Sequence, residues 1–227
     1  RGFLGIFCMC TNGKMKNSKL QLGANLYYML YKNQLVLTGK INDVGAYTRT
    51  NVDNSYRAGI ELEASVQLHR SLNIAGNVTL SKNKISNYTA YADDYDNGGQ
   101  LAFFYSETDI AFSPSAIASG IISWSPCKGC SLVVTEKYVG QQFLDNSGLA
   151  ARSINPYALT DLRLSYAFKL KKVREITLAL QVNNVLDKMY EANGYTFSYQ
   201  YGGQLATENF YYTQAGRYLM SMLVVKF

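Results

Sequence analysis

The sequence predicts an all-β fold, specifically an antiparallel β-barrel that crosses a membrane. Three observations predict it: long segments of alternating polar and apolar residues, connections that are short and long in turn, and an apolar segment that runs to the last residue. Helical periodicity is nearly absent, and no apolar run approaches the roughly 18 residues of a membrane helix. We therefore expect strands to carry this chain through the bilayer.

The longest regular alternation covers residues 55–69. Apolar side chains occupy the even positions from Tyr56 to Leu68, whereas the odd positions are polar or small, and the register does not slip. A strand in a soluble protein averages about 5–6 residues, so this segment is far too long for an ordinary sandwich. Strands of this kind suit a barrel with one lipid-facing and one polar face.

The same alternation recurs along the chain, and it predicts eight strands. Residues 2–10 are a candidate for the remnant of a ninth strand. The eight expected strands are residues 20–30, 55–69, 72–80, 117–125, 131–140, 161–168, 176–183 and 216–227.

The connections between these strands differ in length in a regular way. Short turns fall at residues 68–72, 126–130 and 170–174, and long polar loops are expected at residues 32–54, 86–112, 144–155 and 185–215. Outer-membrane barrels have brief periplasmic turns and extended outer loops. The last strand follows a long loop, so we expect it to end on the periplasmic side.

The final strand has a face that is apolar to its last residue. Ser221 is the only polar side chain on that face, among Leu219, Leu223, Val225 and Phe227. Such a strand needs a neighbour on each edge, which a closed barrel provides. The terminal Phe227 resembles the signal by which outer-membrane proteins are recognised for assembly.

Composition excludes several other classes of protein. The 22 Lys and Arg residues are spread along the chain, so the net charge of +6 does not indicate a nucleic-acid groove. The cysteines form two close pairs, Cys8 with Cys10 and Cys127 with Cys130. A single C-x-x-C is a weak zinc or redox signal, and we interpret residues 126–130 as a tight turn, open or closed by a local disulfide. We expect no metal site, no cofactor and no enzyme activity, since no nucleophile, phosphate-loop or metal-ligand motif is present.

Several segments resemble the TonB-dependent outer-membrane receptors, in the form common in Bacteroidetes-like bacteria. The strongest are VNNVLDKMY (residues 182–190) and the terminal strand after QAGRY (residues 214–218). The others are NLYY (residues 25–28), YKNQLVLTG (residues 31–39), SYRAGIELE (residues 55–63) and EKYVGQQF (residues 136–143). The resemblance divides the chain into an atypical segment, residues 1–15, and a C-terminal part of the receptor barrel, residues 16–227.

The resemblance implies a fold and a function. Receptors of this family have 22-stranded barrels with a plugged lumen, of which this chain would supply about eight or nine strands. They lie in the outer membrane of Gram-negative bacteria and take up a scarce nutrient, such as a ferric siderophore, another iron complex or cobalamin. The implied partners are the nutrient, outer-membrane lipid, the barrel assembly machinery, and TonB through an N-terminal motif that these residues lack.

Aromatic and basic side chains in the expected outer loops are candidates for ligand contact. An aromatic ring beside a guanidinium can hold an anionic ligand. The alternative is that these rings form an interfacial girdle or pack among themselves. Asp93, Asp94 and Asp96 do not have the spacing of an EF-hand loop. The candidates are Tyr47, Arg49, Tyr91, Tyr95, Phe104, Arg152, Tyr195 and Tyr199.

A second interpretation is a self-contained eight-stranded outer-membrane barrel with a structural or adhesive role. The interior of such a barrel is just filled by side chains. Small residues on the expected inner face, Gly23, Gly59, Ser65 and Thr79, favour a wider lumen and hence the receptor fragment.

Overall fold

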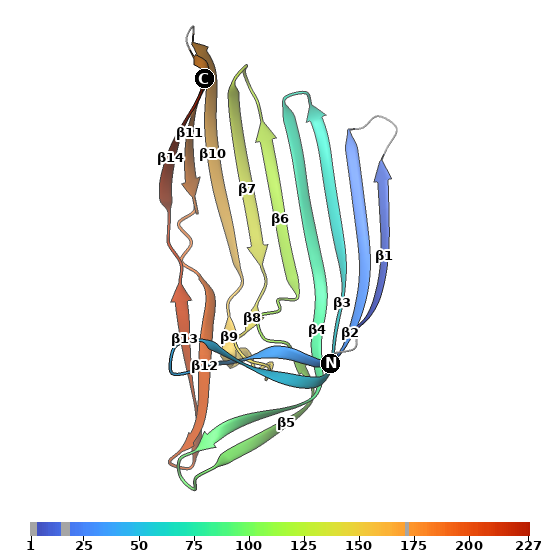
Figure 1. The fold of residues 1–227 in the computed structure, drawn as a ribbon, viewed down its shortest axis with the longest axis vertical. Coiled ribbons are helices and arrows are strands. Elements are labelled where there is room, and N and C mark those ends of the chain that lie inside the picture. The colour runs from blue at the N-terminus through green and yellow to red at the C-terminus, as the bar shows by residue number, and fades with distance from the viewer. Residues whose placement is uncertain (1–3, 15–18, 171–172) are drawn as a thin grey trace.

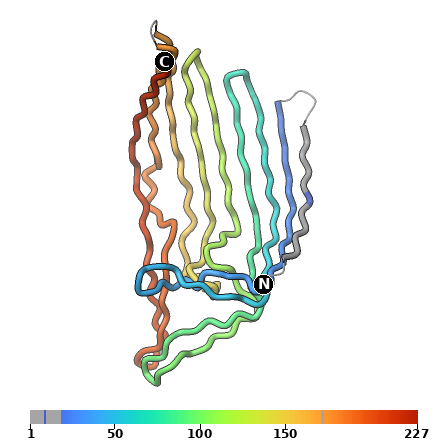
Figure 2. The backbone as a smooth tube through the Cα atoms, viewed as in Figure 1, coloured from blue at the N-terminus to red at the C-terminus, as the bar shows by residue number. Residues whose placement is uncertain are grey.

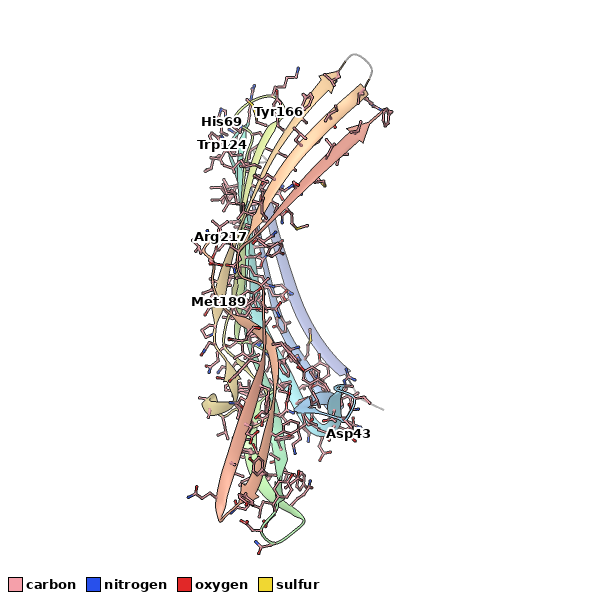
Figure 3. The ribbon with its side chains drawn as sticks, turned by 90° about the vertical axis from the view of Figure 1, so that its left-hand side faces the viewer. Asp43, His69, Trp124, Tyr166, Met189 and Arg217 are labelled. Carbon is pink, nitrogen blue, oxygen red and sulfur yellow. A yellow bond between two sulfur atoms is a disulfide. The ribbon has the colours of Figure 1, made fainter. Side chains whose placement is uncertain are left out.

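The computed structural model describes residues 4–14, 19–170 and 173–227. Within these residues, nine long strands follow one another across a curved antiparallel sheet (Figures 1 and 3). In spatial order they are β1 (Leu4–Lys14), β2 (Leu20–Ile41), β3 (Tyr47–His69), β4 (Leu72–Asp94), β6 (Ala116–Trp124), β7 (Cys130–Val139), β10 (Tyr157–Leu170), β11 (Val173–Asn183) and β14 (Tyr218–Lys226).

This sheet confirms the predicted all-β antiparallel fold. Each of the eight expected strands coincides with one of β2 to β14 on that path, and the candidate ninth strand corresponds to β1. In the part of the chain that the structure describes, no helix is long and apolar enough to span a membrane. The boundary proposed between residues 15 and 16 falls on residues outside the described ones.

The long connections contain more strand than the sequence pattern predicts. The β2–β3 pairing continues from Tyr31 opposite Ser55 to Ile41 opposite Tyr47, so most of residues 32–54 form a hairpin and not an irregular loop. Likewise β5 (Gln100–Asp109) pairs with the outer part of β4, and β12 (Glu191–Tyr201) pairs with β13 (Gln204–Thr213). These segments are rich in Val, Thr, Tyr and Phe, which fit a pleated surface.

The short turns and the end of β14 lie at one end of the sheet, and the hairpin extensions lie at the other (Figure 1). In the β6–β7 turn, Cys127 and Cys130 form a disulfide, the closed form of the predicted tight turn. Gly129 in this turn has φ 85°, and a Cβ atom there would lie 2.1 Å from the Ala167 carbonyl oxygen. Only glycine fits this position without strain.

The register places the predicted apolar stripes on one face of the sheet. Trp124 lies on the convex face (Figure 3), and it is opposite Leu72 on β4 and Leu132 on β7. In the spanning parts of β2, β3, β4, β6, β7, β10 and β11, alternation then puts the even-numbered residues on this face. In β14 it is the odd-numbered residues, because Leu178 pairs with Leu223. The convex face therefore corresponds to the lipid-facing side of a barrel wall.

The concave face is polar and its side chains bond to one another. The Asn25 amide donates to the Glu61 carboxylate at 2.9 Å, and Arg57 donates to the Asn83 side chain at 3.0 Å. The space above Gly59 is taken by the Tyr27 ring, just as Glu63 lies over Gly23. Local packing against Glu63 and Tyr27 thus explains why these two positions are glycine. The sequence-based explanation, a wide lumen, is not needed for them.

The VNNVLDKMY segment forms the rim turn after β11, where three strands meet. Asn184, with φ 51°, exchanges side-chain hydrogen bonds with the backbone of Lys188, and its own N–H donates to Asp161 on β10. The Asp187 carboxylate accepts the N–H of Arg217 at 2.7 Å, just before β14. The motif that carries the family resemblance therefore has a structural role, since it fixes β10, β11 and β14 to one another.

Candidate functional site

The outer end of the β2–β3 hairpin crosses the concave side of the sheet, as Figures 1 and 2 show. We call residues 36–52 the crossing hairpin. Its far end reaches β12, where the Tyr47 hydroxyl lies 2.8 Å from both the Asn193 side-chain oxygen and the Gly194 carbonyl oxygen. Burial raises the pKa of Tyr47, with smaller contributions from the hydroxyls of Tyr212 and Tyr195, so this hydroxyl stays a hydrogen-bond donor.

A small apolar core holds the base of the crossing hairpin. Val36 and Val52 pack against Ile85 and Ile110, and all four are at most 5% exposed. Tyr88 packs against this cluster, and burial raises its pKa, although a hydrogen bond with Asn146 acts in the opposite direction. The hairpin base is therefore fixed by packing rather than by polar contacts alone.

The loop between β7 and β10 supports the crossing hairpin from the side. It contains β8 (Gln142–Phe143), the 3₁₀ turn η1 (Ala150–Arg152) and β9 (Ser153–Ile154). Asn146, fully buried, donates to the Leu37 carbonyl oxygen at 2.7 Å and accepts the N–H of Ala111 at 2.8 Å. Gly39, with φ 83°, approaches this loop so closely that a Cβ atom would lie 2.4 Å from the Leu144 carbonyl oxygen.

These segments enclose a polar chamber of about 370 Å³ on the concave side. Its size falls within the usual range of small-molecule sites, about 300–1,000 Å³. Many hydroxyl and amide groups lie in its walls, which come from the crossing hairpin, β4, the β7–β10 loop and β12. The lining includes Thr38, Lys40, Thr48, Thr50, Asn51, Asp53, Asn87, Tyr88, Tyr91, Asp145, Arg152, Thr196 and Ser198.

The charges around the chamber are nearly balanced. Arg152 and Asp145 are both buried and form an ion pair at 2.9 Å, and Arg152 also donates to the Thr207 hydroxyl at 3.2 Å. The Lys40 ammonium donates to the Tyr91 carbonyl oxygen at 3.4 Å, and Asp53 lies in the same wall. The chamber therefore offers hydrogen bonds from many neutral groups together with two cations and two carboxylates.

Beyond the chamber, the tips of two hairpins from distant parts of the chain are joined. β12 pairs with β4 in parallel at Tyr199 and Asp93, and the Asp96 carboxylate accepts the N–H groups of Gly202 and Gly203, each at 2.8 Å. The Asp94 carboxylate instead bonds within its own turn, where its hydrogen bonds with Asn97 lower its pKa. In the described part of the chain, no group of three His, Cys, Asp or Glu side chains could hold a metal ion.

The candidate contact residues are distributed between the chamber and its surroundings. Tyr91 and Arg152 line the chamber. Tyr47 fastens the crossing hairpin, and Tyr95 packs against Tyr199 with ring centroids 5.5 Å apart. These positions are consistent with either ligand contact or loop packing.

The remaining candidates lie outside the chamber. Tyr195 is stacked on Phe210, with ring centroids 4.9 Å apart. Arg49 is exposed on β3, Phe104 is 68% exposed on β5, and Phe227 is 93% exposed at the end of the chain.

Sequence reasoning missed most of the chamber wall. Five hydroxyl-bearing residues of the wall belong to no recognisable motif. The sequence shows only that hydroxyl residues alternate along a strand at Thr38, Thr48, Thr50, Thr196 and Ser198. Lys40 could not be predicted because its partner, Tyr91, lies about fifty residues away in the sequence. Asp145 could not be predicted because it pairs with Arg152 within an irregular loop.

A curved antiparallel sheet with an apolar convex face, a polar concave face and a chamber among its outer hairpins defines a wall segment of an outer-membrane β-barrel. The chain belongs to the TonB-dependent receptors, since residues 13–185 match the family described as TonB dependent receptor-like, beta-barrel. Members of this family reside in the Gram-negative outer membrane and are transporters rather than enzymes.

Solved structures have the same fold. The siderophore receptor PiuA from Acinetobacter baumannii matches with a TM-score of 0.68 and 17% identity, covering 97% of this chain and 28% of PiuA. The ferric-catecholate import receptor Fiu from E. coli K12 matches with a TM-score of 0.65 and 17% identity, covering 99% of this chain and 28% of Fiu.

The ferric yersiniabactin uptake receptor FyuA from Yersinia pestis matches with a TM-score of 0.66 and 16% identity, covering 100% of this chain and 30% of FyuA. The chain thus spans less than a third of the length of these receptors. No curated protein matches the sequence.

Proposed function

We propose that this chain is the C-terminal barrel wall and outer ligand chamber of a receptor that imports a scarce nutrient, such as a ferric siderophore, another iron complex or cobalamin. The observation that carries the proposal is the chamber beneath the crossing hairpin. It is built from four segments far apart in the sequence, and most of its lining comes from the outer part of the molecule. PiuA is described as a siderophore receptor, and Fiu and FyuA as receptors that import ferric catecholates and ferric yersiniabactin, which supports this class of cargo. The similar OprC is described as a copper transporter.

The chamber chemistry supports a bulky polar ligand. Threonine, serine and tyrosine hydroxyls can donate or accept hydrogen bonds, and Lys40 can add one charge contact. Arg152 contributes less to ligand charge, because its guanidinium is already paired with Asp145. We propose that Tyr47, Tyr95, Tyr195 and Tyr199 act on the ligand indirectly, by holding the chamber walls, whereas Arg49 and Phe104 would meet it only on approach.

Energy for import would come from TonB, through receptor regions beyond this chain. The alternative of a self-contained eight-stranded barrel would require the first and last strands to pair. Among the described residues, β1 and β14 are the two ends of the sheet path and are not paired with each other. This arrangement favours the receptor over the small barrel.

Uptake by the complete receptor that contains this chain tests the proposal. Cells that depend on it would be given radio-iron on a catecholate siderophore, radio-iron on a hydroxamate siderophore, or radio-cobalt cobalamin. Lys40→Ala and Tyr91→Ala should each lower uptake of one of these cargoes about tenfold, the effect of losing a charge-assisted contact or a packed ring. Met189→Ala, an exposed residue outside the chamber, is the control and should leave uptake unchanged. Equal uptake by all three variants would refute the chamber as the ligand site.

We also propose that Phe227 is read by the barrel assembly machinery. Deleting Phe227 should lower the amount of folded receptor in the outer membrane, whereas Phe227→Tyr, which keeps a terminal aromatic ring, should retain it. Unchanged outer-membrane levels after the deletion would exclude this role.

A further inference from the structure

A carboxylate interrupts the apolar convex face. Glu136 on β7 lies opposite Gly120 on β6 and Thr160 on β10, and its side chain is exposed. Along β7 it has Val134 on the side of the short turns and Tyr138 on the outer side. A charged group on the lipid side of a barrel is unfavourable by a few kcal/mol unless it finds a partner, so such a residue indicates a site.

The neighbours of Glu136 within the sheet satisfy it only in part. The Thr160 hydroxyl donates to one carboxylate oxygen, Oε2. Among the described residues of β3, β4, β6, β7 and β10, the other side chains in its row and those of the two adjoining rows are uncharged. No salt bridge involves Glu136 within the described residues. The missing partner is therefore a cation or a strong donor that approaches from the membrane.

The row that contains Glu136 is otherwise made of small residues, so we infer a shallow groove between the larger side chains beside it. Across neighbouring strands it consists of Ala64, Gly76, Gly120 and Glu136, whereas the row below it consists of Val66, Ile74, Ile122 and Val134. Strands are spaced by about 4.8 Å, so the groove runs about 14 Å from Ala64 to Glu136. At Ala64 and Gly76 the row passes through a depression of about 680 Å³, whose lining includes Leu22, Leu62, Glu63, Asn77 and Val78.

The row is inclined relative to the turn ends of its strands. Thr160 lies eight residues from Phe168 near the turn end of β10, whereas Leu22 lies close to the turn end of β2. The row therefore runs from Glu136, six residues from the turn end of β7, to Leu22, next to the turn end of β2. A chain lying in it would have its polar end at Glu136 and its apolar end in the depression.

We propose that this groove binds one lipid whose headgroup carries a free ammonium, with the ammonium on Glu136 and an acyl chain along Gly120, Gly76 and Ala64. Charge complementarity selects the ammonium, because an anionic headgroup would be repelled by the carboxylate. The apolar depression selects an acyl chain over a polar side chain of a neighbouring protein. This site lies on the face opposite the ligand chamber and does not depend on the proposed transport function.

Native mass spectrometry of the complete receptor, purified in detergent, tests this proposal. The probes are phosphatidylethanolamine and phosphatidylglycerol with identical acyl chains, added separately. The wild-type receptor should retain phosphatidylethanolamine about tenfold better than phosphatidylglycerol, as expected for one charge-assisted contact. Glu136→Leu should abolish this preference, and Lys137→Gln, the next residue but on the concave face, should keep it.

A second variant tests the groove without touching the charge. A Cβ atom added at Gly120 would meet only the Ala75 carbonyl oxygen, at 4.0 Å, so Gly120→Leu fits the fold and fills the groove. It should lower retention of both lipids. Equal retention of the two lipids by the wild type, or an unchanged preference in Glu136→Leu, would overturn the proposal. Loss of a co-purifying protein in Glu136→Leu, with lipid retention unchanged, would overturn it in favour of a protein partner.

Discussion

The spanning sheet and the outer hairpins are stabilised in opposite ways. On the convex face of the spanning sheet, large apolar side chains stay open, with Leu62 40% and Leu219 64% exposed. In the outer part, Val36, Ile85 and Leu144 are at most 5% exposed, and buried polar groups such as Asn146 are bonded to the backbone. The spanning sheet therefore relies on lipid as its solvent, whereas the outer part carries its own core. Single substitutions in each region should show whether the two regions are stabilised independently.

The largest effect is expected in the buried ion pair of the outer part. Arg152→Ala leaves Asp145 buried without its partner, which should destabilise the outer region by about 3–5 kcal/mol. Hydrogen exchange at the β7–β10 loop and β13 should accelerate, while exchange in β6 and β7 stays slow. Arg49→Ala, at an exposed position, is the control and should change stability by no more than about 0.5 kcal/mol. Faster exchange throughout the sheet would show that the two regions are not independent.

The next effect should appear in the spanning sheet. Leu62→Lys puts a charge on the convex face and should cost about 2–4 kcal/mol if this residue lies near the bilayer midplane. Glu63→Lys, the adjacent residue on the polar concave face, should cost much less. Unfolding of the complete receptor in lipid vesicles measures both. Equal tolerance of the two substitutions would contradict the assignment of faces.

A smaller effect is expected at the joined hairpin tips. Asp96→Asn keeps the shape of the side chain but removes the charge that accepts two backbone N–H groups, at a cost of about 1 kcal/mol at this exposed position. Hydrogen exchange at Gly202 and Gly203 should accelerate, and exchange in the chamber walls should not. Asp93→Asn, on the neighbouring carboxylate, is the matched control. Unchanged exchange at both glycines would mean that strand pairing alone joins the tips.

The smallest effect is a pH dependence at the β4–β5 turn. Asn97 lowers the pKa of Asp94 below its unfolded value of about 3.9, so the stabilisation is present above that pH and is lost as the pH falls through the folded pKa. Amide exchange at Asp96 and Asn97, whose N–H groups bond to Asp94, should rise in acid relative to residues of β7. Asp94→Asn should remove this pH dependence. Retention of the dependence in that variant would assign it to another group.

The sequence predicted the spanning sheet better than the outer part, and the reason is physical. In residues 55–69 every side chain is assigned to a face by the period of two, so the strand and the environment of each side chain follow from the pattern. In the outer part, the contacts that matter join residues without any pattern, such as Tyr47 with Asn193 and Asn146 with Leu37. The sequence identified the aromatic-rich segments as candidate sites. It could not predict which rings would pack together, because that depends on how hairpins distant in the sequence are placed against one another.

The crossing hairpin also has a consequence for the order of folding. The contact that fastens it joins residues 146 positions apart in the chain, whereas β2 and β3 themselves pair locally. Contacts of such long range form late, since the loop-closure entropy must be met first. The contact between Tyr47 and β12 should therefore form after the strands of the wall have paired, once β12 has been added. Until that moment only the base of the hairpin is held, by the core around Val36 and Val52. A protease added during assembly should therefore cut at the exposed tip, residues 42–46, and cleavage should stop once β12 is in place.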